Sequence, residues 1–219
     1  MNRFDRDILF LETLRRSSKA RHRLKKQTGG PGHFAVVELE VRPLARDSGF
    51  RFVDSVVEGR IPNAFVPAVE KGARKALARG PIGGFPVVDV EVELLDGQAH
   101  KRDSHAVDFE TAGLVAVQAA MAEAQPAILE PMGLLELGCP VPSVGFALGR
   151  LAARRSSVVG TGFEAGLYVI RAMIPILERK AFEAELSQAT SGTARCSVRP
   201  SSHAVMPDAL VSTLFGRRP

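Results

Sequence analysis

Alternation of apolar and polar residues predicts three strands in the first half of the chain. Residues 34–44 (FAVVELEVRPL) place valine and leucine on one face and mainly glutamate and arginine on the other, which is typical of a half-buried strand. Residues 86–95 (PVVDVEVELL) alternate in the same way and end at an Asp96-Gly97 turn. Another strand, about 50–57, follows the turn-forming residues 47–49. These strands are expected to turn their valine-rich faces inward.

Two helices accompany these strands. The apolar residues of segment 65–79 recur at helical spacing, and Gly80-Pro81 ends the segment. Asp103 or Ser104 is placed to cap an alanine-rich helix that runs to about Glu123. The first domain is therefore expected to contain strands, a helix, a strand and a helix.

The pattern changes from residue 127 onward and predicts six further elements. They are a strand near 132–138, a helix of about 143–154, strands near 157–163 and 167–174, a helix near 177–188 and a strand near 193–199. The order β-α-β-β-α-β is typical of a ferredoxin-like split βαβ unit. The tail after Pro207 shows no pattern that would pair it with another element, and we expect it to be frayed.

The charge of the chain is positive and concentrated near the N-terminus. The formal net charge is +5, and the twelve positions from residue 15 to residue 26 hold no acid. The cations there are Arg15, Arg16, Lys19, Arg21, Arg23, Lys25 and Lys26, with His22 among them. Such a block suits contacts with RNA phosphates, although a solvated or disordered arm explains the same charge pattern.

Several kinds of catalytic or metal chemistry find little support. No lysine is followed by serine or threonine, so the GxxxxGKS/T phosphate loop is missing. Ser104, His105 and Asp108 are too close in sequence for a triad and fit a capped helix start better. His33, His100 and Asp103 lack a metal-ligand spacing. We expect neither catalytic residues nor a bound metal or cofactor in this chain.

Other features point to a monomer in a reducing cytoplasm. Cys139 and Cys196 lie far apart and form no CxxC pair, so the sequence implies neither a disulfide framework nor a zinc site. The longest uncharged run, 137–149, contains two prolines and is far shorter than a membrane span. The N-terminus carries charged residues in place of a secretory signal.

One glycine-rich segment joins the basic block to the strand that begins at Phe34. Gly29, Gly30 and Gly32 surround Pro31 and permit backbone conformations and close approaches that side chains would prevent. A tight turn explains the segment, and so does a loop that meets an RNA backbone closely.

The segments 25–34 (KKQTGGPGHF) and 80–90 (GPIGGFPVVDV), with other motifs spread over about residues 12–207, resemble the C-terminal half of bacterial elongation factor G and its paralogues. The first segment is similar to the family's entrance into its fourth domain, and the second is similar to a later block of that domain. The Asp96-Gly97, His100 and Asp103-Ser104 spacing matches the loop before the second helix. Further matches are 59–62 (GRIP), 66–72 (VPAVEKG), 129–132 (LEPM), Arg154-Arg155, Pro175, Leu186, Thr190 and Gly192.

The resemblance implies an α+β protein. A domain like the second domain of ribosomal protein S5, residues 17–128, would be followed by a ferredoxin-like βαββαβ domain, residues 129–207. Residues 1–16 would be a remnant of the preceding domain and residues 208–219 a tail.

The resemblance also implies a ribosome-binding part of a translocation factor. In the family the fourth domain contacts messenger and transfer RNA at the decoding centre. The basic block and the resemblance together give the candidate RNA-binding or ribosome-binding residues, which are Arg15, Arg16, Lys25, Lys26, Gly29, Gly30, Gly32, His33, His100, Asp103, Ser104, Arg154 and Arg155. GTP and magnesium would belong to the family's GTPase domain, which this chain would lack.

The sequence departs from the family pattern at several positions. His33 replaces a common glutamine, Ser187 replaces an expected arginine, and Ser156 replaces a glycine after Arg155. These departures suggest a paralogue of the housekeeping factor. Two alternatives stay open: a separate ribosome-binding protein that competes for the A site, and an enzyme on the same fold, for which no phosphate loop is visible.

We expect the chain alone to hydrolyse no GTP, because it lacks a phosphate-cradling loop. The measurement is phosphate release from GTP by the purified protein, compared with a heat-inactivated control. Release above the control would contradict the expectation.

Overall fold

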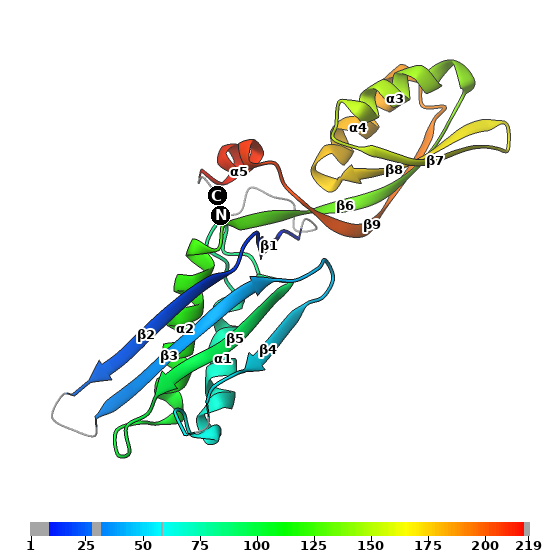
Figure 1. The fold of residues 1–219 in the computed structure, drawn as a ribbon. Coiled ribbons are helices and arrows are strands. Elements are labelled where there is room, and N and C mark those ends of the chain that lie inside the picture. The colour runs from blue at the N-terminus through cyan, green and yellow to red at the C-terminus, as the bar shows by residue number, and fades with distance from the viewer. Residues whose placement is uncertain (1–8, 28–31, 58, 217–219) are drawn as a thin grey trace. The chain divides into compact units, whose positions relative to one another are not determined.

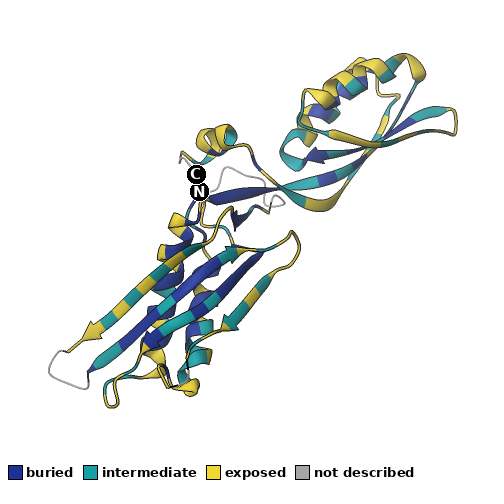
Figure 2. Cartoon of the chain, viewed as in Figure 1, coloured by how far each residue is buried: buried dark blue, intermediate teal, exposed yellow. Residues whose placement is uncertain are grey.

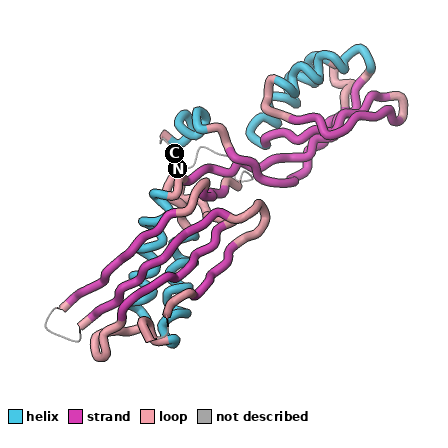
Figure 3. Tube along the Cα trace, in the orientation of Figure 1, coloured by secondary structure: helices cyan, strands magenta, loops and turns pink. Residues whose placement is uncertain are grey.

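The computed structural model describes residues 9–27, 32–57 and 59–216, which fall into two compact units (Figure 1). The larger unit comprises the described residues of 11–129 and 206–219, and the smaller unit those of 1–10 and 130–205. Each unit combines helices with a sheet (Figure 3). The predicted α+β class is therefore confirmed.

A four-stranded sheet in the order β2-β3-β5-β4 forms the frame of the larger unit. Its strands are β2 (Ser18–Lys26), β3 (His33–Pro43), β4 (Phe50–Asp54) and β5 (Val90–Gln98). Strand β3 is antiparallel to both β2 and β5, whereas β4 is parallel to β5. The predicted strand 34–44 is thus the central β3, and its apolar face is buried (Figure 2).

Two helices cover one face of this sheet (Figure 1). They are α1 (Val66–Leu77), preceded by the short η1 (Asn63–Phe65), and α2 (Ala106–Glu123). Phe65 and Phe109 stack with ring centroids 4.9 Å apart within the apolar core that the helices share with the sheet. The charged residues of the strands lie on the opposite face of the sheet, which the two helices do not cover.

The basic block is a strand, not a disordered arm. In β2 the side chains of Ala20 and Leu24 pack against the core, while Lys19, Arg21 and Arg23 are exposed. This two-residue alternation was present in the sequence, but the density of charge obscured it. The pairing of all nine β2 residues with β3 shows why the segment is ordered.

Strand β5 is displaced from its predicted position. It spans Val90–Gln98, so the Asp96-Gly97 pair lies inside the strand and is not a turn. A register shift opposite Glu38 and Leu39 accommodates Leu95 as an extra residue. A β-carbon at Gly97 would lie 2.4 Å from both the Ile61 side chain and the Val36 carbonyl oxygen, which explains the glycine by close packing.

The N-terminal cap of α2 also differs from the prediction. His105 is the N-cap residue, and its backbone N–H donates to Asp108 Oδ2 at 2.9 Å. Asp103 and Ser104 instead lie in the preceding loop. Asp108, the third residue of the helix, accepts the hydrogen bond of the otherwise unpaired N–H of the cap residue, as in a capping box.

Both ends of the chain contribute elements to the larger unit. Strand β1 (Leu11–Leu14), within the predicted remnant 1–16, pairs with the first residues of β6 (Pro126–Cys139), and Leu14 lies in the core. Helix α5 (Asp208–Phe215) buries Val211, and Asp208 forms an ion pair with Arg15. The prediction that the tail is frayed is therefore wrong for residues 208–215.

The smaller unit has the ferredoxin-like topology that the sequence predicted. Strand β6 pairs with β8 and β9, and β7 pairs with β8, so the strand order is β9-β6-β8-β7. The elements are β7 (Ser157–Glu164), β8 (Leu167–Pro175), β9 (Arg195–Val205), η2 (Val141–Ser143), α3 (Val144–Ala152) and α4 (Ile176–Ala189). Both cysteines are free, and burial raises the pKa of Cys196 to about 11.

A buried carboxylate fastens β1 to the loop that leads into β5. Glu12 is fully buried, and its side chain accepts hydrogen bonds from the backbone N–H groups of Ile82, Gly83 and Phe85 at 2.8–3.1 Å. The sequence offered no signal for this contact, because Glu12 lies some 70 positions away from its partners.

We expect Glu12→Ala to lower the free energy of unfolding by about 3 kcal/mol, since each buried N–H left without an acceptor costs about 1–3 kcal/mol. Urea unfolding measures this. Glu38→Ala is the control, because Glu38 is more exposed and its ion pair with Arg21 spans 3.9 Å. Equal effects of the two substitutions would contradict the assigned role of Glu12.

Candidate nucleic-acid interface

Two loops meet at the end of the larger unit where the β2–β3 hairpin turns. Lys26 pairs with His33 at the end of the hairpin, and Val36 pairs with Gln98 near the end of β5. Because β3 and β5 are antiparallel, the start of β3 lies beside the loop that follows β5. We call this region, residues 23–27, 32–34 and 99–105, the tip.

Backbone and side-chain hydrogen bonds join the two loops of the tip. The N–H of Phe34 donates to the Asp103 carbonyl oxygen at 2.7 Å, and Ser104 Oγ donates to the Phe34 carbonyl oxygen at 2.5 Å. Ser104 Oγ also accepts the N–H of His100 at 2.8 Å. Ser104 is thus a positioning residue that ties the 99–105 loop to β3.

Gly32 allows the loops to approach closely. A β-carbon there would lie 2.7 Å from Asp103 Cγ, too short for a normal contact. Close packing against Asp103 therefore explains why residue 32 is a glycine. Gly29 and Gly30, which the resemblance also implies as RNA-binding residues, lie outside the described residues.

Each of the two predicted tip histidines is held by a carboxylate. His33 Nδ1 lies 2.8 Å from Asp108 Oδ1, and His100 Nδ1 lies 2.8 Å from Asp103 Oδ2. The side chains of His33 and His100 remain 43% and 54% exposed. The described parts of both loops therefore lie side by side and are accessible to solvent.

The cations of the basic block divide into two groups. Lys19 and Arg21 form ion pairs with Glu40 and Glu38 on β3. Within the described part of the chain, no carboxylate lies within ion-pair distance of Arg23, Lys25 or Lys26, all of which are exposed. The cations of β2 that are free to attract an anion therefore lie at the tip.

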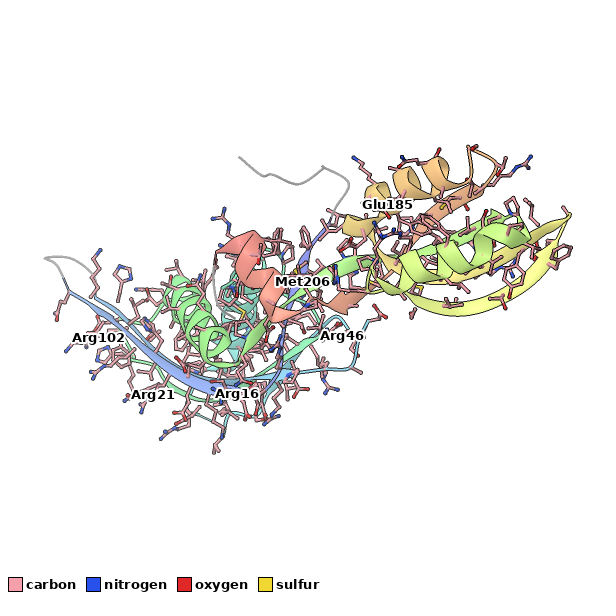
Figure 4. All side chains as sticks on the ribbon, turned by 90° about the horizontal axis from the view of Figure 1, so that it is seen from above. Arg16, Arg21, Arg46, Arg102, Glu185 and Met206 are labelled. Carbon is pink, nitrogen blue, oxygen red and sulfur yellow. The ribbon has the colours of Figure 1, made fainter. Side chains whose placement is uncertain are left out.

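The remaining predicted cations lie elsewhere and are already engaged. Arg15 pairs with Asp208, and the guanidinium of Arg16 donates to the Glu123 carbonyl oxygen at 2.7 Å. Figure 4 shows Arg16 well separated from Arg102 of the 99–105 loop. The structure does not bring Arg15 and Arg16 to the tip.

Two arginines of the smaller unit are held by carboxylates. Arg154 donates to Glu185 at 2.6 Å, and its side chain is only 11% exposed. Arg155 forms ion pairs with Glu130 and Glu178. These contacts connect the turn after α3 with α4 and β6, a structural role that the sequence did not reveal.

A shallow pocket marks the tip. Its volume is about 240 Å³, and it is lined by residues that include Arg23, Lys25, Phe34, His100 and Asp103. Arg23 and Phe34 were not among the residues predicted for the site. Arg23 pairs with Val36 and Phe34 with Lys25, so Arg23 and Phe34 are diagonal neighbours on one face of the β2–β3 pair. The two-residue alternation of both segments was the available signal.

No group of acidic, histidine or cysteine residues suited to a metal ion occurs among the residues that the structure describes. In the same residues, no helix is both long enough and apolar enough to cross a membrane.

The fold and the tip define a class of α+β proteins in which an S5-like unit with a cationic hairpin end is joined in sequence to a ferredoxin-like unit. The family model described as elongation factor G, domain IV, matches residues 7–125, and the one described as elongation factor G C-terminus matches residues 127–214. The chain belongs to the elongation factor G family. The resemblance inferred from the motifs is thereby confirmed.

Individual relatives agree with this assignment. The chain is 35% identical over 212 residues to an elongation factor G-like protein of Thermotoga maritima and 34% identical over 211 residues to elongation factor G of Aquifex pyrophilus. These matches cover 96% of this chain but only 31% and 30% of the relatives. A crystal structure of a protein from Thermus thermophilus has a TM-score of 0.82 and 30% identity, covering 95% of this chain and 31% of that one.

We expect Asp108→Ala to lower the free energy of unfolding by about 2 kcal/mol, because it removes both the helix cap and the partner of His33. Thermal or urea unfolding measures the loss. Glu110→Ala, in the same helix, is the matched control, because its ion pairs with Lys71 and Lys75 lie on the surface and should matter little. A larger loss in the control would contradict this expectation.

Proposed function

We propose that this chain is a ribosome-binding part of an elongation-factor-G-like translocation factor and that its tip contacts RNA at the decoding site. The chain spans about a third of the relatives that it matches, so the activity of a whole factor is part of the proposal. Only domain IV and the C-terminal domain of the family are matched in these residues. Hydrolysis of GTP would depend on a domain that this chain does not contain.

The separation of paired from unpaired cations is the observation that carries the proposal. Glu38 and Glu40 neutralise the middle of β2, but Arg23, Lys25 and Lys26 keep their charge available at the tip. Exposed cations bind phosphates largely through the release of counterions. The tip is therefore the part of the larger unit best suited to messenger, transfer or ribosomal RNA.

The accessible polar groups of the tip fit RNA as well. The Nδ1 atoms of His33 and His100 lie 2.8 Å from carboxylate oxygens of Asp108 and Asp103, and both side chains remain accessible to solvent. Imidazole rings stack on unpaired bases and form hydrogen bonds with them. Asp103 and Ser104 would act indirectly, because their described contacts orient the loop that carries His100.

Four other candidate arginines have weaker support as RNA ligands than the tip cations have. They are Arg15, Arg16, Arg154 and Arg155. Their guanidinium groups already contact carboxylates or a carbonyl oxygen of the same unit. Binding RNA would require these contacts to be shared or broken. We therefore assign the first contacts with RNA to the tip cations.

We expect Lys25→Ala/Lys26→Ala to weaken binding of the chain to ribosomes and to flatten its salt dependence. The slope of log affinity against log salt should fall by about one for each lysine removed. Filter binding or sedimentation over a series of salt concentrations measures this slope.

Lys19→Ala/Arg21→Ala is the matched control, because it also removes two cations from β2, but two that are paired with glutamates. It should change the slope less than the tip variant does. An unchanged slope in Lys25→Ala/Lys26→Ala, or an equal change in the control, would contradict the assignment of phosphate contacts to the tip.

A further inference from the structure

Strand β7 lies at one edge of the sheet of the smaller unit. In the strand order β9-β6-β8-β7, its one strand partner among the described residues is β8. The backbone N–H and C=O groups along the other side of an edge strand can pair with a further strand, and proteins usually prevent this with charged side chains or proline. The residues of β7 therefore decide whether this edge can pair with another chain.

Three other edge strands of the described sheets carry such protection, whereas β7 does not. Strand β2 is rich in lysine and arginine, β4 contains an arginine and an aspartate, and β9 contains two arginines and a proline. Residues 157–163 of β7 (SVVGTGF) contain neither a charged residue nor a proline. The last residue of the strand, Glu164, is charged, but it accepts a hydrogen bond from Arg171 of β8. The edge of β7 is thus open to pairing.

Two apolar side chains of β7 are largely exposed to solvent. Val159 and Phe163 are 57% and 64% exposed. Phe163 is opposite Tyr168, which packs against the core of the smaller unit, but Phe163 itself is not part of that core. A register shift makes Val159 an extra residue of β7, and it lies at one end of the segment 159–163, so the centre of the segment stays regular. Covering these two side chains with another apolar surface would be favourable.

The segment 159–163 is self-complementary in an antiparallel pairing. Val159 and Phe163 each lie two positions from Thr161. A second, antiparallel β7 with the two-fold axis at Thr161 therefore places Val159 of each copy opposite Phe163 of the other. Gly160 then pairs with Gly162, so no side chains collide there. Each Thr161 lies opposite its counterpart, and threonine pairs across strands are favourable.

We propose that β7 forms the contact of a symmetric dimer, in which the β7 strands of two copies of this chain pair antiparallel about Thr161. The contact covers Val159 and Phe163 and provides partners for the backbone groups of both edges. A strand pair of this length buries less than the roughly 1,200 Å² of a standard interface, so the dimer is weak, with a Kd of about 100 µM. The monomer predicted from the sequence is then the form at low concentration. The inference is independent of the RNA contact proposed for the tip.

Sedimentation equilibrium of the purified chain, over about 5–500 µM, measures this association on both sides of the expected Kd. We expect the weight-average mass to rise from 23.5 kDa toward twice that value as the concentration increases. A mass that stays at that of the monomer over the whole range would overturn the proposal.

Substitutions at Thr161 test the two-fold axis. Thr161→Lys and Thr161→Glu each place two like charges opposite each other in a homodimer and should abolish the association. An equimolar mixture of the two variants should associate again, because lysine then lies opposite glutamate. Thr111→Lys, at an exposed position of α2, is the matched control and should associate like the unchanged chain. Equal association of Thr161→Lys and the control, or a mixture that stays monomeric, would overturn the dimer.

A second variant tests the apolar contact without adding charge. Phe163→Ser should weaken the association about five-fold, because each dimer loses both of its Val159–Phe163 pairs. Phe146→Ser, which changes an exposed phenylalanine of α3, is its control and should have no effect. Circular dichroism melting checks that each variant is folded. Self-association that responds equally to Phe163→Ser and Phe146→Ser would assign the contact to another surface and overturn the proposal.

Discussion

The candidate site depends on the antiparallel pairing of β3 with β5. Because these strands run in opposite directions, the first residues of β3 and the loop after β5 meet at one end of the sheet, although they are separated by more than sixty positions in sequence. The hydrogen bonds of Phe34 with Asp103 and Ser104 then fix the two loops to each other. Without this register, His33, His100 and the hairpin cations would lie on unrelated parts of the surface.

Charge is distributed along the same sheet in a way that limits where a polyanion can bind. Glutamates of β3 lie opposite Lys19 and Arg21, and further along the strand Val36 and Phe34 lie opposite Arg23 and Lys25. The change from glutamate to apolar partners leaves the last cations of β2 unpaired. A phosphate group is therefore attracted to the cations at the tip, whereas the charges in the middle of β2 and β3 largely neutralise one another. This distribution, more than the total charge of the chain, makes the tip the candidate RNA contact.

Buried carboxylates hold the elements that support the tip. Asp108 accepts the N–H of the α2 cap residue and contacts His33, so the start of the helix and the hairpin are fixed together. Glu12 has a similar role elsewhere in the larger unit, where its carboxylate accepts hydrogen bonds from three backbone N–H groups. In the smaller unit the buried Glu130 forms an ion pair with Arg155, and the partly exposed Glu185 forms one with Arg154. These acidic residues belong to no recognisable sequence motif. Each one nevertheless stabilises the fold, because it lies beside hydrogen-bond donors from distant segments of the chain.

The sequence by itself determined the α+β class, the ferredoxin-like order of the second half and the family, because strand and helix periodicity and local motifs are properties of short segments. Through the family resemblance, it also named His33 and His100 as candidate RNA contacts. Only the tertiary structure decided which cations are free, since pairing with Glu38, Asp208 or Glu185 depends on residues far away in the chain. It likewise showed that residues 18–26 are a strand, that residues 208–215 are a helix, and that Arg23 and Phe34 belong to the site. The physical reason is that ion pairs, strand register and stacked rings form between segments that the fold brings together.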